Sequence, residues 1–183
     1  MNLRFEEEKK HEQRMQFLKG AIRFLIMAAE GVFAWLIVTF ALKKVSVIGS
    51  SMETTLYNGE DVIVNKTSYV LFSPKRNQII AFYPEAQDEE ETTNSDSMIH
   101  IRRVAGLPGE KVQIKNGKLY INGEEQKEKY DFEAMHSGGR AVNEITLKDD
   151  EYFVLSDSRN DMDDSRNSSF TKVTKKNIIG KVI

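Results

Sequence analysis

Two hydrophobic patterns divide the chain. Residues 24–42 form a 19-residue apolar run in which Glu30 is the single charge. A helix of that length spans roughly 28 Å at about 1.5 Å per residue, which is enough to cross a bilayer. From Val45 onward the pattern changes to short apolar runs that are separated by Gly, Asn and Pro. We therefore predict one transmembrane helix followed by one mostly β domain.

Eight short runs in this second region have the length and composition of strands: 45–49, 61–66, 78–83, 99–105, 111–114, 118–121, 144–147 and 151–155. Two Asn-Gly pairs, Asn116-Gly117 and Asn122-Gly123, follow consecutive runs. Both residues of such a pair tolerate a positive φ, which a two-residue hairpin turn requires. Each pair therefore predicts a hairpin turn, and the acidic, polar stretch 88–97 is predicted to be a loop.

The charges that flank the apolar run indicate its direction in a membrane. Six basic residues precede the run, and Lys43 and Lys44 follow it closely. The positive-inside rule then favours a single-pass protein of the cell membrane, with a cytoplasmic tail over 1–23, a transmembrane anchor over 24–42 and an extracytoplasmic domain over 45–183. A cleavable signal peptide is the alternative, but the apolar region of a signal peptide is shorter, about 7–15 residues.

Composition narrows the chemistry. The 183 residues include no cysteine, which excludes disulfides, thiolate metal sites and a cysteine nucleophile. The three histidines are widely separated and lack the spacing of a metal site, so no metal or other cofactor is expected. The 26 basic and 28 acidic residues are spread along the chain and give a net charge of −2, which argues against nucleic acid as a partner.

Five motifs follow the apolar run in order. They read GSSMETTL at 49–56, GEDVIVNK at 59–66, SPKR at 73–76, RRVAGLPGE at 102–110 and SDSRNDMDDSR at 156–166. These motifs resemble the boxes SMxPTL, GDxVxVNK, PKRGD, KRVxGxPGD and GDNRxxSxDSR of the type I signal peptidase family, in its Gram-positive-like form. The resemblance covers most of the predicted β domain and rests on the joint order of the five boxes.

The resemblance implies an endopeptidase that removes signal peptides from exported proteins, with a Ser/Lys dyad on a β-rich fold whose active site faces the membrane. Signal peptides and membrane lipid are the partners it implies. By this resemblance Ser51 matches the nucleophile, its N–H would be one oxyanion donor, and Met52 is expected to contact the substrate. Arg102 stands at the position of the lysine base.

The last box, residues 156–166, both matches and departs from the family pattern. Its matches include four residues that brace the site in the family: Asp157, Arg159, Asp164 and Arg166. Met162 replaces a serine that positions the lysine, Ser156 replaces glycine and Ser158 replaces asparagine. A glycine there could serve a positive φ, which serine takes less readily. In the first box, residues 49–56, Thr54 replaces the proline.

Arg102 is predicted not to act as a base. Burial can lower a lysine pKa from about 10.4 by up to roughly 3–5 units, whereas an arginine pKa near 13.8 would need to fall by roughly 7 units, or about 9 kcal/mol. Pairing of Arg102 with a carboxylate of the last box is expected instead. His100 projects from the same strand face and is an alternative base, although its offset of about 7 Å along the strand argues against it.

Two functions remain open. The first is a membrane-bound serine endopeptidase that removes signal peptides, and the second is a catalytically impaired homologue that acts as a binding or chaperone factor for secreted or pilus-type proteins. In the second case an extended partner segment would be held by strand addition.

Overall fold

The structure is a computed structural model, and it describes residues 2–83, 99–128, 130, 132–170 and 172–183. The stretch 88–97, predicted to be a loop, lies outside the described residues. The chain divides into two compact units, Met1–Ala41 and Leu42–Ile183.

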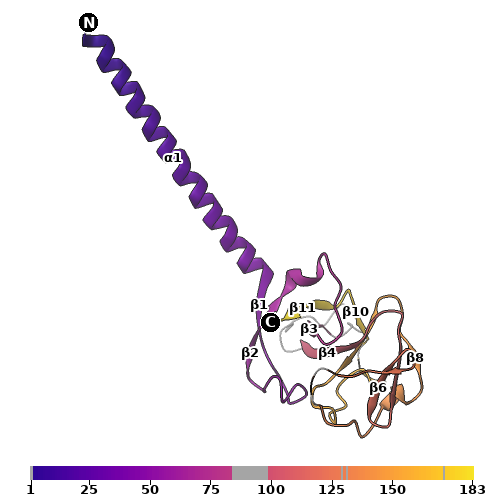
Figure 1. Cartoon of the computed structure of the whole chain (residues 1–183). Helices are drawn as coiled ribbons and strands as arrows, with labels where there is room; N and C mark the ends of the chain where they lie inside the picture. The colour runs from indigo at the N-terminus through magenta and orange to yellow at the C-terminus, as the bar shows by residue number, and fades with distance from the viewer. Residues whose placement is uncertain (1, 84–98, 129, 131, 171) are drawn as a thin grey trace, which may run out of the picture. The chain divides into compact units, whose positions relative to one another are not determined.

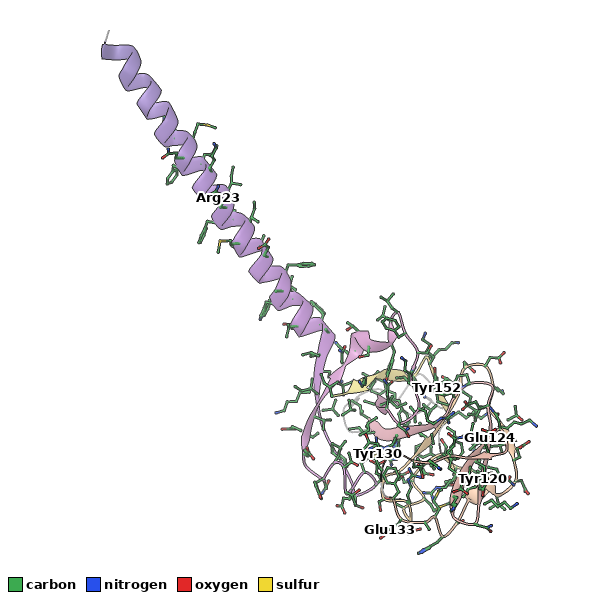
Figure 2. The ribbon with its side chains drawn as sticks, in the orientation of Figure 1. Arg23, Tyr120, Glu124, Tyr130, Glu133 and Tyr152 are labelled. Atoms are coloured by element: carbon green, nitrogen blue, oxygen red, sulfur yellow. The ribbon has the colours of Figure 1, made fainter. Side chains whose placement is uncertain are left out.

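The first unit is one continuous helix, α1 (Asn2–Ala41), which ends one residue before the last residue of the predicted apolar run (Figure 1). Side chains project from every side of α1 (Figure 2), and the large apolar ones are exposed, among them Phe24, Met27, Phe33 and Trp35. Among the described residues α1 is the one helix long and apolar enough to cross a membrane, over Arg14–Ala41. A helix that is apolar on all sides is typical of a membrane span.

In the second unit, the described strands form two antiparallel sheets. The larger sheet has the order β1 (Leu42–Ser46), β2 (Asp61–Asn65), β11 (Ile178–Val182), β3 (Ile79–Phe82), β4 (His100–Gly106), β9 (Glu151–Leu155) and β10 (Val173–Thr174). The smaller sheet has the order β7 (Glu124–Glu125), β6 (Lys118–Ile121), β5 (Lys111–Lys115) and β8 (Ile145–Thr146). Two 3-10 helices, η1 (Lys66–Tyr69) and η3 (Gly139–Val142), lie between strands. The prediction of a mostly β domain is confirmed.

The two predicted hairpin turns are also confirmed. Asn116 and Gly117 have φ values of 52° and 76°, and they connect the paired residues Lys115 and Lys118 of β5 and β6. Asn122 and Gly123, with φ values of 52° and 83°, connect β6 to β7 in the same way. Positive φ at both central residues is the geometry for which an Asn-Gly pair is suited.

Three strands were not predicted: β7, β10 and β11. The first two are only two residues long. In β11 the sequence IIGKV is interrupted by Gly180, where a Cβ atom would lie 2.3 Å from the carbonyl oxygen of Asn65. The glycine that weakens the strand pattern is thus required by the close approach of β11 to β2.

The larger sheet is packed on both faces around β3 and β4. Ile80 and Phe82 belong to a core cluster with Val104, Tyr152, Val154 and Val173. Ala81 and Ile101 belong to another, which contains Met52 and residues of β1 and β2. Successive residues of a strand project to opposite faces. Because Ile80 pairs with Arg102, the side chain of Arg102 projects to the Ile80 face and that of Arg103 to the Met52 face.

Candidate active site

Ser51 lies in the segment between β1 and β2 and is 5% exposed. The base of this segment is closed by two backbone hydrogen bonds: Val47 N–H donates to Glu60 O at 2.8 Å, and Gly59 N–H donates to Val47 O at 2.8 Å. Leu56 N–H donates to Met52 O at 2.8 Å and forms a turn directly after the serine. These bonds fix the backbone on both sides of Ser51.

The last box, residues 156–166, also holds the backbone of Ser51 by a hydrogen bond. Ser158 N–H donates a hydrogen bond to the Ser51 carbonyl oxygen at 3.0 Å. Within the described part of the chain, neither the Ser51 hydroxyl nor the Ser51 N–H has a hydrogen-bond partner. A hydroxyl that is free to attack, beside an N–H that is free to bind an oxyanion, is the arrangement that a serine nucleophile requires.

Thr54 has a backbone conformation that a proline could not adopt. Its φ is 82°, whereas the proline ring locks φ near about −65°. A β-branched residue in this region is strained, by roughly 1–2 kcal/mol. The first box therefore lacks the family's proline at a position, three residues after the serine, where the backbone has a φ that proline could not adopt.

Met52 is 1% exposed and packs in the cluster that contains Val45, Val64 and Ile101. In this conformation its side chain contributes to the core of the domain and is not available at the surface. A substrate contact by Met52 stays a prediction, and it would have to be made by the main chain.

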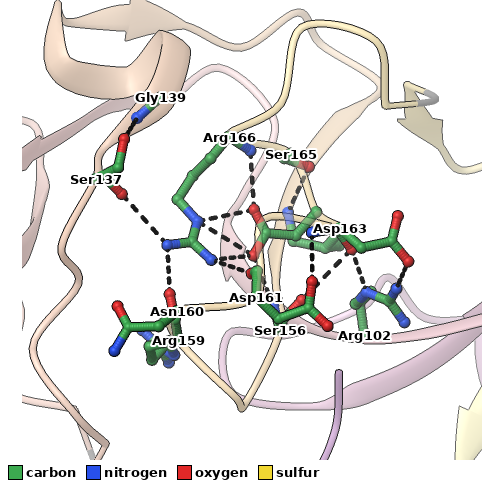
Figure 3. Close-up of polar contacts among 12 residues, drawn as sticks. Arg102, Ser137, Gly139, Ser156, Arg159, Asn160, Asp161, Asp163, Ser165 and Arg166 are labelled. Atoms are coloured by element: carbon green, nitrogen blue, oxygen red, sulfur yellow. Dashed lines mark hydrogen bonds and ion pairs between the residues drawn. The ribbon is translucent and has the colours of Figure 1, made fainter. Parts of the chain in front are cut away.

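Arg102 is held by the last box, as predicted. The residue is 4% exposed. Its Nε donates to the Asp163 carbonyl oxygen at 2.6 Å, its Nη1 donates to the Ile101 carbonyl oxygen at 2.6 Å, and its Nη2 forms an ion pair with the Asp163 carboxylate (Figure 3). Burial lowers the pKa of Arg102, and the charges of Asp163, Asp164 and Asp161 oppose this effect.

His100 lies beside Arg102 among aromatic rings. Its ring stacks on Phe82 with centroids 5.7 Å apart and meets the edge of Phe170 at 5.5 Å. Burial and the charge of Arg102 lower the pKa of His100, so the ring is neutral at neutral pH, whereas Asp163 acts in the opposite direction. No hydrogen bond between described residues joins His100 to Ser51, and its role as a base stays a prediction.

Arg103 is a residue that the sequence interpretation missed. Its Nε and Nη2 donate to the two carboxylate oxygens of Asp157 at 2.7 and 2.5 Å. Two further hydrogen bonds run from Nη1 to the Asn77 carbonyl oxygen at 2.9 Å and from Nη2 to Thr55 Oγ1 at 3.3 Å. The alternation of strand residues could have placed it opposite Arg102, but the sequence alone could not identify its partners. Arg103 connects the first box, the turn before β3 and the last box.

A second buried ion pair holds the shape of the last box. Arg166 donates from Nε and Nη2 to Asp164 at 2.9 and 2.6 Å, and neither side chain is exposed (Figure 3). Asp164 also accepts a hydrogen bond from the N–H of Ser156 at 3.0 Å. Ser156 does not have a positive φ, so its hydroxymethyl group is accommodated without strain at the position of the family's glycine.

Comparison with known proteins places these features in a family. The family model described as "Signal peptidase, peptidase S26" matches residues 18–183. The chain belongs to this family. Signal peptidase I of Bacillus amyloliquefaciens is 33% identical, over 95% of this chain and 90% of its own length. Signal peptidase I S of Bacillus subtilis is 34% identical, over 81% of this chain and 79% of its own.

Signal peptidase IB of Staphylococcus aureus is 29% identical, over 88% of this chain and 83% of its own length. A crystal structure of a signal peptidase I from Enterococcus faecalis is 29% identical and covers 61% of this chain and 97% of that one, with a TM-score of 0.43. Membership confirms the predicted family, a serine peptidase of signal-peptidase type, and it supports the removal of signal peptides as the function. No group of three His, Asp or Glu residues in the described part of the chain could hold a metal ion.

Proposed function

We propose that this signal peptidase homologue is a membrane-bound serine endopeptidase that removes signal peptides from exported proteins with Ser51 as its nucleophile, and that it does so slowly. The observation that supports the proposal most directly is the hydrogen bonding of Ser51. Its carbonyl oxygen is held by Ser158 N–H at 3.0 Å, while its hydroxyl and N–H are unengaged among the described residues.

The proposed reaction follows from these groups. Ser51 Oγ attacks the scissile carbonyl carbon and gives up its proton to water, while the Ser51 N–H donates to the oxyanion. The C–N bond then breaks as the leaving amine takes a proton from water, and the acyl-enzyme forms. Water then hydrolyses the ester and releases the free serine. Arg102 stays charged and takes no proton from Ser51. A positioned general base contributes about 10²- to 10⁴-fold, so turnover should be lower by that factor than with a lysine base.

The test is a single-turnover cleavage assay of the purified full chain in lipid, with enzyme in excess over a peptide that carries a small-x-small cleavage site. Ser51→Ala should reduce cleavage to the rate without protein. Ser50→Ala is the matched control, because this neighbouring serine is exposed, and it should keep the wild-type rate. Equal cleavage by the wild type and Ser51→Ala would refute the nucleophile.

Attachment to a membrane forms part of the proposal. We assign residues 1–23 to a cytoplasmic tail, 24–42 to the anchor and 45–183 to an extracytoplasmic domain. The apolar exposed surface of α1 supports the anchor. In the second unit η1 contacts β1, the strand that begins the domain, and three exposed apolar residues follow η1: Val70, Leu71 and Phe72, which are 72%, 84% and 69% exposed. Such a turn is suited to the edge of a lipid bilayer.

The topology can be tested with the full chain in cells. The protein should resist extraction by alkaline carbonate, and a tag at the C-terminus should be digested by external protease while a tag at the N-terminus is protected. Protection of the C-terminal tag would refute the proposed orientation, and release by carbonate would refute the anchor.

A second function, a binding or chaperone factor for secreted or pilus-type proteins, is favoured by the contacts of Arg102. Because Arg102 is committed to Asp163 and cannot be a base, a signal peptide could be bound without being cut. This function predicts measurable affinity for exported peptides together with no cleavage that depends on Ser51. Absence of that affinity would rule it out.

A further inference from the structure

Asp163 binds the side chain at position 102 through two of its oxygens. The carbonyl oxygen of Asp163 accepts from Arg102 Nε at 2.6 Å, and its carboxylate pairs with Arg102 Nη2 (Figure 3). The Asp163 side chain is 55% exposed, whereas that of Arg102 is 4% exposed. The family pattern leaves the residue at position 163 open, so the resemblance assigns this carboxylate no role.

We propose that Asp163 is a positioning residue that binds the cation at position 102 and that would keep a lysine at this position charged. Under the function proposed above, on which this inference rests, the exchange Arg102→Lys alone leaves a charged lysine beside Asp163. Removal of the Asp163 carboxylate as well lowers the pKa of that lysine.

The other titratable groups near position 102 act on it less directly than Asp163 does. Asp164 is fully buried and paired with Arg166, and it acts on Arg102 through its charge without a hydrogen bond to it. Asp161 accepts the N–H of Asp163 at its Oδ1, 3.0 Å away, and thereby helps to direct Asp163. His100, on the same strand face, is neutral at neutral pH. Asp163 is the carboxylate that touches the cation itself.

The two environmental effects at this position act against each other. Burial can lower a lysine pKa by up to about 3–5 units, whereas an opposite charge within about 4–6 Å raises it by about 1–3 units. With Asp163 present, the carboxylate cancels much of the effect of burial. With Asp163 neutralised, burial acts alone, and the pKa of a lysine there moves toward the range in which a lysine can accept a proton from serine.

The experiment compares Arg102→Lys with Arg102→Lys/Asp163→Asn in the full chain reconstituted in lipid nanodiscs. The pKa of the introduced lysine is measured by NMR titration of ¹³C-labelled lysine, with its signal assigned by difference from the wild type. We expect this pKa to be about 1–3 units lower in the double variant. Arg102→Lys/Asp149→Asn is the matched control, because it removes the same charge at an exposed residue, and it should leave the pKa unchanged.

Cleavage gives a second readout. At a pH below the lysine pKa of both variants, a fall of about 1–3 units in that pKa raises the fraction of neutral lysine by roughly 10- to 1,000-fold. Cleavage by the double variant should therefore begin at a pH about 1–3 units lower than cleavage by Arg102→Lys. If the double variant does not fold, Arg102→Lys/Asp163→Ser replaces it. Lysine pKa values that agree within about 0.3 units in the single and double variants would overturn the inference. A shifted pKa without cleavage dependent on Ser51 would uphold it and refute the proposed nucleophile instead.

Discussion

Arg103 and Asp157 form a buried ion pair whose strength can be tested directly. The side chains are 3% and 0% exposed, and two hydrogen bonds of 2.7 and 2.5 Å join the guanidinium to both carboxylate oxygens. Burial lowers the pKa of Arg103, but the interactions with Asp157 and, after them, with Tyr130 together outweigh it, so the net pKa is raised. Asp157→Asn keeps the shape of the side chain and removes its charge. The variant therefore leaves Arg103 as a buried cation without its counter-ion.

The expected loss of stability follows from the contacts that remain. Removal of one partner of a buried pair costs about 3–5 kcal/mol. Arg103 keeps its bond to the Asn77 carbonyl at 2.9 Å and its position over the Tyr130 ring, 4.2 Å from the centroid. We therefore expect the lower limit, about 3 kcal/mol. At roughly 2–4 °C per kcal/mol for a protein of this size, the melting temperature should fall by about 6–12 °C.

Differential scanning calorimetry of the full chain in detergent measures this change. Asp61→Asn is the control, because Asp61 pairs with Lys44 at the surface, with side chains 46% and 72% exposed. Solvent screens such pairs, and the melting temperature of this variant should stay at the wild-type value. If Asp157→Asn lowers the melting temperature no more than Asp61→Asn does, the reasoning on burial is wrong.

Three further predictions concern the backbone and pH. Thr54→Gly should raise the melting temperature, because glycine removes the strain at φ 82°, whereas Thr54→Pro, although it restores the family's proline, should lower it. Gly180→Ala should cost about 1–3 kcal/mol in denaturant unfolding, because its Cβ would lie 2.3 Å from a backbone oxygen; an unchanged midpoint would contradict this. Because the folded pKa of His100 is lowered, the unfolded chain binds the proton more readily, and stability should be lost as the pH falls below about 6.5. His100→Phe should remove that slope, and an unchanged slope would exclude His100 as its origin.

The features that the sequence determined by itself are local. The apolar run predicted the part of α1 that is long and apolar enough to cross a membrane, because helix length and hydrophobicity are properties of one continuous segment. Asn116-Gly117 and Asn122-Gly123 predicted their turns, because a positive φ depends on the residue itself. The order of five motifs identified the family, and this resemblance, together with the charge and shape of a guanidinium, indicated that Arg102 would pair with a carboxylate of the last box.

The tertiary structure decided whatever depends on residues that are distant in the chain. Strand β11 forms because Gly180 lets it approach β2, which lies more than a hundred residues earlier. Adjacent arginines of β4 have separate roles because the strand directs Arg102 to Asp163 and Arg103 to Asp157, on opposite faces of the sheet. The motif pattern leaves position 163 open, so the carboxylate that holds Arg102 became identifiable only when packing brought the last box against β4. An ion pair depends on distance in space, and the spacing of residues along the chain does not contain that distance.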